Sequence, residues 1–160
     1  MIYVECKPDV YLVYVLIKRP SDEVEHCGGR SKVLEKLERG KQHIGIVDED
    51  PDALQDPRIK NFDKVDNFDF IKSKYLLALY EDRNKNKLIR ICPQLEDWIF
   101  RISKEEKDIN LKDFGFSDDL YRFRNEAKLN PGKFQQLLQQ LIERKNEKLI
   151  FLRDFILGKN

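Results

Sequence analysis

Long hydrophobic runs, paired cysteines and an excess of one charge are all scarce in this chain of 160 residues. The apolar stretch at residues 10–17 is too short to cross a bilayer. The N-terminus lacks the charged start and the small-residue cleavage site of a signal peptide. We therefore expect a cytoplasmic protein with no membrane partner.

Cysteine and histidine are too few and too scattered for a structural metal site. Cys6, Cys27 and Cys92 are odd in number and have no CxxC spacing, which argues against both a disulfide framework and a zinc site. His26 and His43 lack the partner spacing of a zinc site or a catalytic triad. The sequence predicts reduced thiols and structural histidines.

Charge is abundant but balanced. The chain has 30 Lys and Arg against 29 Asp and Glu, a net charge of +1. This balance excludes the strong basic field of a protein that holds nucleic acid by overall charge alone. A polyanionic partner would have to meet a local basic patch or bound metal ions. The length fits a single compact domain.

Short β-branched runs alternate with helical segments in the first half of the chain. Strands are predicted at residues 2–5, 23–27 and 43–47, and helices at 10–18 and 31–39, although 10–18 could also form a strand. An irregular connection with one weak helical turn follows at 52–73, then a hairpin at 75–80 and 87–92 and a helix at 94–103. A loop at 111–119 leads to a helix capped near Ser117, and one or two helices follow 131–132. The order predicts an α/β fold: a mostly parallel, Rossmann-like sheet flanked by helices, with a helical extension at the C-terminal end.

Acidic residues stand where two of the predicted parallel strands end. Glu5 closes the first strand and Asp48 the third, and Asp50 lies two positions further on, before a proline. Parallel strands place ligands at their carboxyl ends, and clustered carboxylates suit Mg²⁺ or Mn²⁺. The alternative is that "DEDPD" is only a solvated turn after a strand.

Four segments resemble landmarks of the Toprim family, in the branch related to overcoming-lysogenization-defect (OLD) nucleases. "YVECKPD" (3–9) is similar to the first motif, a strand ending in Glu before a basic and an acidic residue. "HIGIVDEDP" (43–51) resembles the DxD motif of the third strand. "HCGGR" (26–30) resembles the glycine-rich end of the second strand, and "ICPQLEDWIF" (91–100) the proline and acidic helix start after the hairpin. Cys6 departs from the pattern, because the family usually has glycine there.

The resemblance covers residues 1–103 as a Toprim-like α/β core and leaves 104–160 as a helical extension packed on it. It implies a metal-dependent nuclease for DNA or RNA, with Mg²⁺ or Mn²⁺ as cofactor. Glu5 would act as a catalytic acid or base and as a metal ligand, and Asp48 and Asp50 would hold the metal. Glu96 is a further metal ligand, with Asp97 as its alternative. Lys7 would be catalytic by orienting the scissile phosphate, or else it is a surface lysine before a proline.

A basic segment around the predicted hairpin could track a nucleic-acid backbone, or could simply form a solvated rim. Its members are Lys72, Lys74, Arg83, Lys85, Lys87 and Arg90. Two other functions stay open. The resemblance also allows a non-catalytic binding or effector module with a residual acidic site, working with a separate ATPase in phage defence or DNA repair. A phospho-acceptor receiver domain is a further alternative, although such domains place an acidic pair after the first strand.

Overall fold

A computed structural model of the chain describes residues 1–18, 21–50, 52, 54–65 and 77–159. Its strands are β1 (Ile2–Val4), β2 (Val24–His26), β3 (Ile44–Asp48), β4 (Phe62–Lys64), β5 (Leu77–Asp82) and β6 (Lys87–Ile91). Its helices are α1 (Lys7–Ile17), α2 (Arg30–Arg39), α3 (Leu95–Glu105), α4 (Leu120–Leu129), α5 (Pro131–Glu143) and α6 (Glu147–Ile156). Short 3₁₀ turns are η1 (Ser21–Glu23), η2 (Pro57–Asn61) and η3 (Leu111–Phe114).

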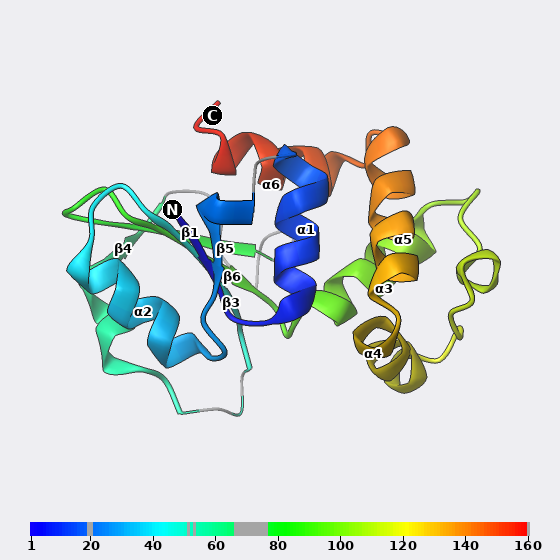
Figure 1. The fold of residues 1–160 in the computed structure, drawn as a ribbon, viewed down its shortest axis with the longest axis horizontal. Coiled ribbons are helices and arrows are strands. Elements are labelled where there is room, and N and C mark those ends of the chain that lie inside the picture. The colour runs from blue at the N-terminus through cyan, green and yellow to red at the C-terminus, as the bar shows by residue number, and fades with distance from the viewer. Residues whose placement is uncertain (19–20, 51, 53, 66–76, 160) are drawn as a thin grey trace.

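The strands form one mixed sheet in the order β2-β1-β3-β6-β5-β4. β1 pairs in parallel with β2 and β3, and β3 pairs in parallel with β6. β5 is antiparallel to β6 and to β4, so β2 and β4 are the outer strands. The predicted α/β class is confirmed, with helices on both faces of a mostly parallel sheet (Figure 1).

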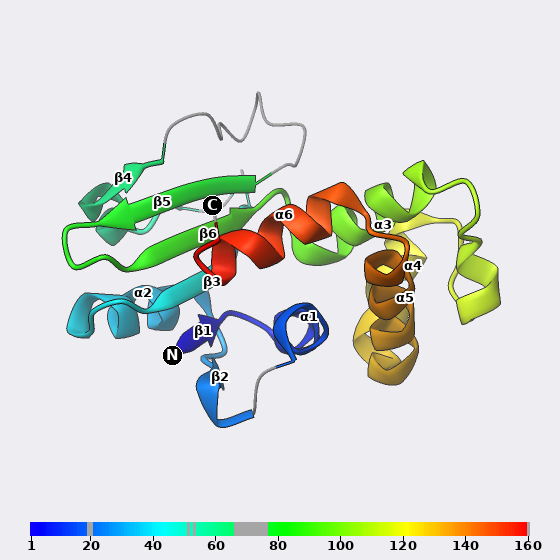
Figure 2. The same ribbon diagram turned by 90° about the horizontal axis from the view of Figure 1, so that it is seen from above.

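Alternate side chains of the strands enter two hydrophobic clusters. On one face Tyr3, Val47 and Leu88 pack with Val33, Leu34 and Leu37 of α2. On the other face Val4, Ile46 and Ile89 join a larger cluster that includes α1, α3, α5 and α6. Figure 2 shows α6 running from the other C-terminal helices back over the sheet. The period-two alternation is what a sheet covered on both faces requires.

Gly45 allows α2 to pack closely on β3. A Cβ atom at this position would lie 2.7 Å from Leu37 Cδ1 and 2.9 Å from Val33 Cγ1. These separations are shorter than any normal carbon–carbon contact, so a larger residue would force the Leu37 and Val33 side chains, or the helix that carries them, to shift. The glycine of "HIGIV" therefore fixes the spacing between the central strand and its covering helix.

Two elements differ from the sequence prediction. α1 begins at Lys7 rather than at residue 10, because Pro8 is tolerated in a first helical turn and the Asp9 carboxylate accepts the Cys6 N–H at 2.8 Å. The three-residue strand β4 was not predicted, because Phe62–Lys64 is too short to show alternation and two of its three residues are exposed. In the described part of the chain, no helix has the length and apolar character needed to cross a membrane.

Candidate functional site

The sheet brings the ends of β1 and β3 together at its carboxyl edge. The two strands pair in parallel with Val4 opposite Ile46, so Glu5 and Asp48 both follow at the carboxyl ends of the strands. The Asp48 N–H donates to Glu5 Oε2 at 3.0 Å, across 43 residues of sequence. The acidic ends of the two strands therefore meet at one point of the structure.

The start of α3 joins the same point. β6 lies beside β3, with Asp48 opposite Ile91, and α3 begins four residues after Ile91. The Leu95 N–H, in the first turn of α3, donates to Asp48 Oδ1 at 2.9 Å. A carboxylate at a helix N-terminus is stabilised by the unpaired N–H groups and the helix dipole. Asp48 therefore holds α3 against the carboxyl edge of the sheet.

Asp9 and Glu96 complete what we call the acidic cluster: Glu5, Asp9, Asp48 and Glu96. Asp9 and Glu96 are each only 1% exposed. Burial raises the pKa of Asp48 to about 8, and repulsion from Asp9, Glu96 and Glu5 adds to this. Burial likewise raises the pKa of Asp9 to about 7, with repulsion from Glu96 and Glu5, against the lowering effect of the hydrogen bonds with Cys6. The four carboxyl groups are therefore close enough to repel one another.

Asp9 is the member that sequence analysis did not select as a site residue. It lies in the first turn of α1. The signal was its position in "YVECKPD", four residues after Glu5, because one helical turn returns the chain to the strand end. Cys6, between them, is a neutral thiol, since burial and the neighbouring Asp9 carboxyl group raise its pKa.

The structure distinguishes Glu96 from Asp97. Arg124 of α4 binds Asp97 with both arms of its guanidinium, Nε to Oδ1 and Nη2 to Oδ2, each at 2.6 Å. Glu96 Oε1 is buried and accepts no hydrogen bond within the described residues. Burial raises the pKa of Glu96, although Lys128 opposes this shift. Asp97 is therefore a structural residue, and Glu96 has an oxygen available for a ligand.

Asp50 and Lys7 are exposed, unlike the four residues of the acidic cluster. The Asp50 side chain is exposed and its Oδ1 accepts the N–H of Asp52 at 3.0 Å, which closes a local turn. Lys7 is exposed at the first position of α1. The turn interpretation of "DEDPD" therefore describes Asp50, while Asp48 belongs to the acidic cluster.

The acidic cluster has the carboxylate oxygens that a hard cation needs as ligands, but these oxygens are not arranged around a common point. Among the described residues, no three Asp, Glu, His or Cys side chains are placed so that they could hold a metal ion. Glu5 Oε2 and Asp48 Oδ1 each accept a backbone N–H instead. The buried Glu96 oxygen, which accepts no hydrogen bond, and the mutual repulsion of the carboxylates fit Mg²⁺ or Mn²⁺, provided that side chains rotate when an ion binds.

The basic residues of the hairpin lie at the opposite end of the strands from the acidic cluster. Lys87 is level with Ile44 at the start of β3, whereas Asp48 ends that strand, four residues or about 13 Å away. Lys87 Nζ donates to the Phe155 carbonyl at 2.9 Å, and Lys85 pairs with Glu81 at 2.8 Å. Lys72 and Lys74 lie outside the described residues. The described lysines of this segment cannot contact a phosphate held at the acidic cluster.

Arg90 is a buried structural residue rather than part of a basic surface. It is 7% exposed and forms an ion pair with Glu49. Its guanidinium also donates to Tyr80 Oη at 3.1 Å and to Gln55 Oε1 at 2.9 Å. The prediction that Arg90 belongs to a solvated basic segment was wrong, because β6 is an inner strand of the sheet and all its residues after Lys87 are buried.

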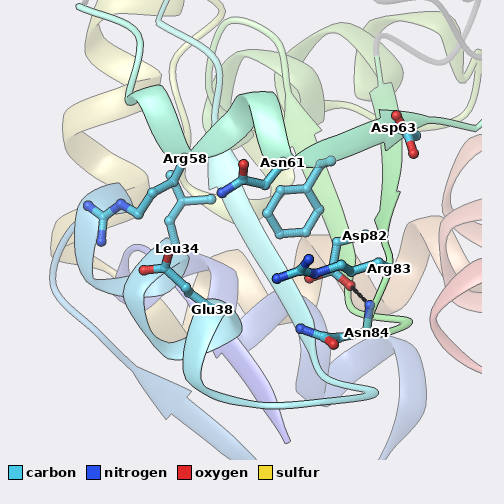
Figure 3. A pocket seen from close by; sticks show the side chains of 9 residues that line it. Leu34, Glu38, Arg58, Asn61, Asp63, Asp82, Arg83 and Asn84 are labelled. Carbon is cyan, nitrogen blue, oxygen red and sulfur yellow. Dashed lines mark hydrogen bonds between the residues drawn. The ribbon is translucent and has the colours of Figure 1, made fainter.

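A hollow of about 360 Å³ lies far from the acidic cluster, between α2, η2, β4 and the hairpin turn (Figure 3). Arg83, the remaining basic residue of the predicted segment, lines it beside Asn84 and Asp82. Arg58 also lines it, but its guanidinium binds Asp56 and Ser31 at 2.7 Å each. No residue of the acidic cluster lines this hollow.

Comparison with known proteins leaves the geometry as the only guide to function. No family model, curated protein or solved structure matches the chain.

Proposed function

We propose that the chain is a Toprim-like, divalent-metal-dependent phosphodiesterase that cuts nucleic acid at the acidic cluster. One observation carries the proposal: the hydrogen bond from the Asp48 N–H to the Glu5 carboxylate, which joins two acidic strand ends 43 residues apart. Asp9 and Glu96 add two buried carboxyl groups to this point. Such a concentration of acidic groups is costly for folding and is typical of cation or proton-transfer sites.

The residues have separable roles in the proposed reaction. Glu5, Asp48 and Glu96 would hold Mg²⁺ or Mn²⁺, which supplies an activated water and neutralises charge on the phosphate. Glu5, which unlike Asp9 and Glu96 is only partly buried, would take the proton of the attacking water. The water oxygen bonds to phosphorus while the ester P–O bond breaks, and the leaving oxygen then receives a proton. Before the metal binds, Asp9 and Asp48, with raised pKa values, can exchange protons near neutral pH.

Cleavage of labelled single- and double-stranded DNA and RNA tests the proposal. Wild-type protein is expected to cut in Mg²⁺ or Mn²⁺ and to be inactive in EDTA. Glu5→Gln should cut about 100-fold more slowly or not at all, because the neutral amide is a poor metal ligand and cannot accept the proton. Glu38→Gln, at an exposed carboxylate on α2, is the matched control and should cut like the wild type. Metal-dependent cutting that survives Glu5→Gln would show that the acidic cluster is not the site.

A non-catalytic effector module is the second candidate. It is favoured by the absence, among the described residues, of three side chains already placed around an ion, and by the backbone N–H groups that Glu5 and Asp48 accept. In that case the acidic site would be residual, and a partner ATPase would carry the activity. Calorimetry separates the two: a catalytic site should bind Mn²⁺ with a dissociation constant that Glu5→Gln weakens, whereas a residual site binds neither Mn²⁺ nor Mg²⁺.

Both candidates place the protein in the cytoplasm, where the three free cysteines would stay reduced.

A further inference from the structure

Helix α4 presents a cationic surface beside the acidic cluster. Its ten residues include Arg122, Arg124 and Lys128 against a single acid, Glu126. Glu126 accepts the Ser117 N–H at 2.7 Å, so its charge is directed towards the loop before the helix. α4 packs against α3, the helix that carries Glu96.

The two cations of α4 that face α3 are bound differently. Arg124 is fully engaged by Asp97 through two short hydrogen bonds. Lys128 Nζ lies 3.7 Å from Glu96 Oε1, which is an ion pair without a hydrogen bond, and its side chain is 53% exposed. Lys128 therefore stands between solvent and the acidic cluster with an ammonium group that can bind an incoming anion.

Exposed apolar residues lie on the same surface of α4. Tyr121 is 72% exposed and Leu129 is 79% exposed. Tyr121 and Lys128 are seven residues apart, which is close to two full helical turns, so they share one face at a separation of about 10 Å. Exposed aromatic rings beside cations are the means by which proteins hold unpaired bases and the phosphates between them.

We propose that the exposed face of α4 is the binding surface for single-stranded nucleic acid, with Lys128 holding a phosphate next to Glu96 and Tyr121 stacking on a base. This proposal rests on the proposed function and names its substrate class. It also assigns a function to part of residues 104–160, since α4 would guide the single-stranded nucleic acid onto the acidic cluster. Charge complementarity supports the occupant, because Arg122 and Lys128 are exposed on a helix whose one acid is engaged elsewhere.

Fluorescence anisotropy with a labelled oligonucleotide tests the surface without requiring cleavage. Binding of single-stranded DNA, single-stranded RNA and duplex DNA is measured on the full chain in Ca²⁺ over a range of salt concentrations. Lys128→Gln should weaken single-strand binding by about three- to tenfold and reduce the salt slope by about 0.7. Tyr121→Ala should weaken it by about tenfold with little change in the salt slope. The DNA and RNA arms identify which strand the surface prefers.

Lys36→Gln is the matched control. Lys36 also pairs with a glutamate, Glu25, but it lies on α2, which covers the opposite face of the sheet from α3, and its variant should bind like the wild type. Equal binding by Lys128→Gln and Lys36→Gln, tighter binding of duplex than of single strands, or no binding by the wild type would each overturn the surface assignment.

The outcomes separate this inference from the proposed function. Metal-dependent cleavage that needs Glu5 but not Lys128 or Tyr121 would retain the function and overturn the α4 surface. Lys128-dependent strand binding without cleavage in Mg²⁺ or Mn²⁺ would retain the surface and overturn the phosphodiesterase.

Discussion

Asp48 and Asp9 hold their protons at pH values where a carboxyl group in water would have lost them. Burial and neighbouring carboxylates raise both pKa values from an ordinary 3.8, to about 8 for Asp48 and about 7 for Asp9. In the unfolded chain these groups ionise near their ordinary value. The native protein therefore binds more protons than the unfolded chain between about pH 4 and pH 8.

We expect the metal-free protein to lose stability as the pH rises through this interval. Because the native state binds the extra protons, the free energy of unfolding falls with increasing pH above 3.8 and levels off above about 8. Thermal unfolding in EDTA at intervals from pH 5 to pH 9 measures this trend. Added Mn²⁺ should raise the melting temperature most at the alkaline end, because ionised carboxylates bind the cation. A melting temperature that rises from pH 5 to pH 8 would contradict the assigned pKa shifts.

Asp48→Asn should remove part of the pH dependence. The amide keeps an oxygen for the Leu95 N–H and stays neutral at every pH, so we expect this variant to be more stable than the wild type at pH 8 by about 1–2 kcal/mol. At pH 4, where Asp48 is protonated, the two proteins should unfold alike. Asp113→Asn, an exposed aspartate in η3, serves as the control and should follow the wild type at both pH values.

At the scale of elements, a single buried asparagine joins α2, β3 and the hairpin. Asn86 is fully buried, and its Nδ2 donates to the Leu37, Gly40 and Asp82 oxygens at 2.8, 3.1 and 2.8 Å. Its Oδ1 accepts the His43 N–H at 3.0 Å. The end of α2 and the start of β3 thus depend on one side chain for their buried polar groups.

Asn86→Ala should destabilise the protein by about 2–4 kcal/mol, because several buried backbone groups lose their partner. Urea unfolding followed by circular dichroism measures the loss. Asn84→Ala, two residues earlier in the hairpin turn, should change stability by less than about 0.5 kcal/mol, since its main-chain carbonyl, which accepts the Gln42 N–H, is retained. Similar losses in both variants would show that the turn, rather than the Asn86 side chain, provides the stability.

Elements with a strong local signal could be predicted from the sequence. The short β-branched runs, the glycines after the second strand and after α2, and the proline after β6 defined the strands and helices of the first half. β4 could not be predicted, because its place at the edge depends on pairing with β5 rather than on its own three residues. Arg90 was misread for a related reason: burial of its charge depends on Glu49, Tyr80 and Gln55, which only the fold brings to it.

The candidate site was likewise predictable only in part from the sequence. Glu5 and Asp48 could be placed at one edge because parallel strands align their ends. Glu96 was preferred to Asp97 on the resemblance alone, and the sequence left Asp97 as an alternative, since what separates the two is Arg124, 27 residues further along the chain from Asp97. The metal, the substrate and the likeness to Toprim nucleases stay predictions that the experiments above test.

On the scale of the whole molecule, the sheet and the C-terminal helices share one core. The larger hydrophobic cluster combines strand residues such as Val4 and Ile46 with residues after position 105. The later members are Leu111, Phe116, Phe123, Ala127, Phe134, Leu137, Leu138, Leu141, Leu149, Leu152, Phe155 and Ile156. α1 lies between the two parts, in contact with α5 on one side and with the sheet on the other. Figure 1 shows this arrangement, with α1 between the sheet and α5.

A fragment ending at residue 105 should therefore not fold cooperatively. It would expose the faces of α1 and α3 that the later helices bury, and we expect a broad thermal transition and binding of a hydrophobic dye. A chain ending at residue 157 removes residues 158–160, of which the described Gly158 and Lys159 are exposed, and should unfold like the full chain. A sharp, two-state transition in the 1–105 fragment would show that the first part folds alone.

The two outer strands influence how copies of this protein can meet. β2 and β4 are each three residues long as described, and both carry charged side chains, Glu25 in the first and Asp63 and Lys64 in the second. Short, charged outer strands offer few main-chain groups to a strand of another molecule and so disfavour fibril-like stacking at high concentration. Any self-association of this chain would then proceed through helical surfaces, where α4 is already exposed.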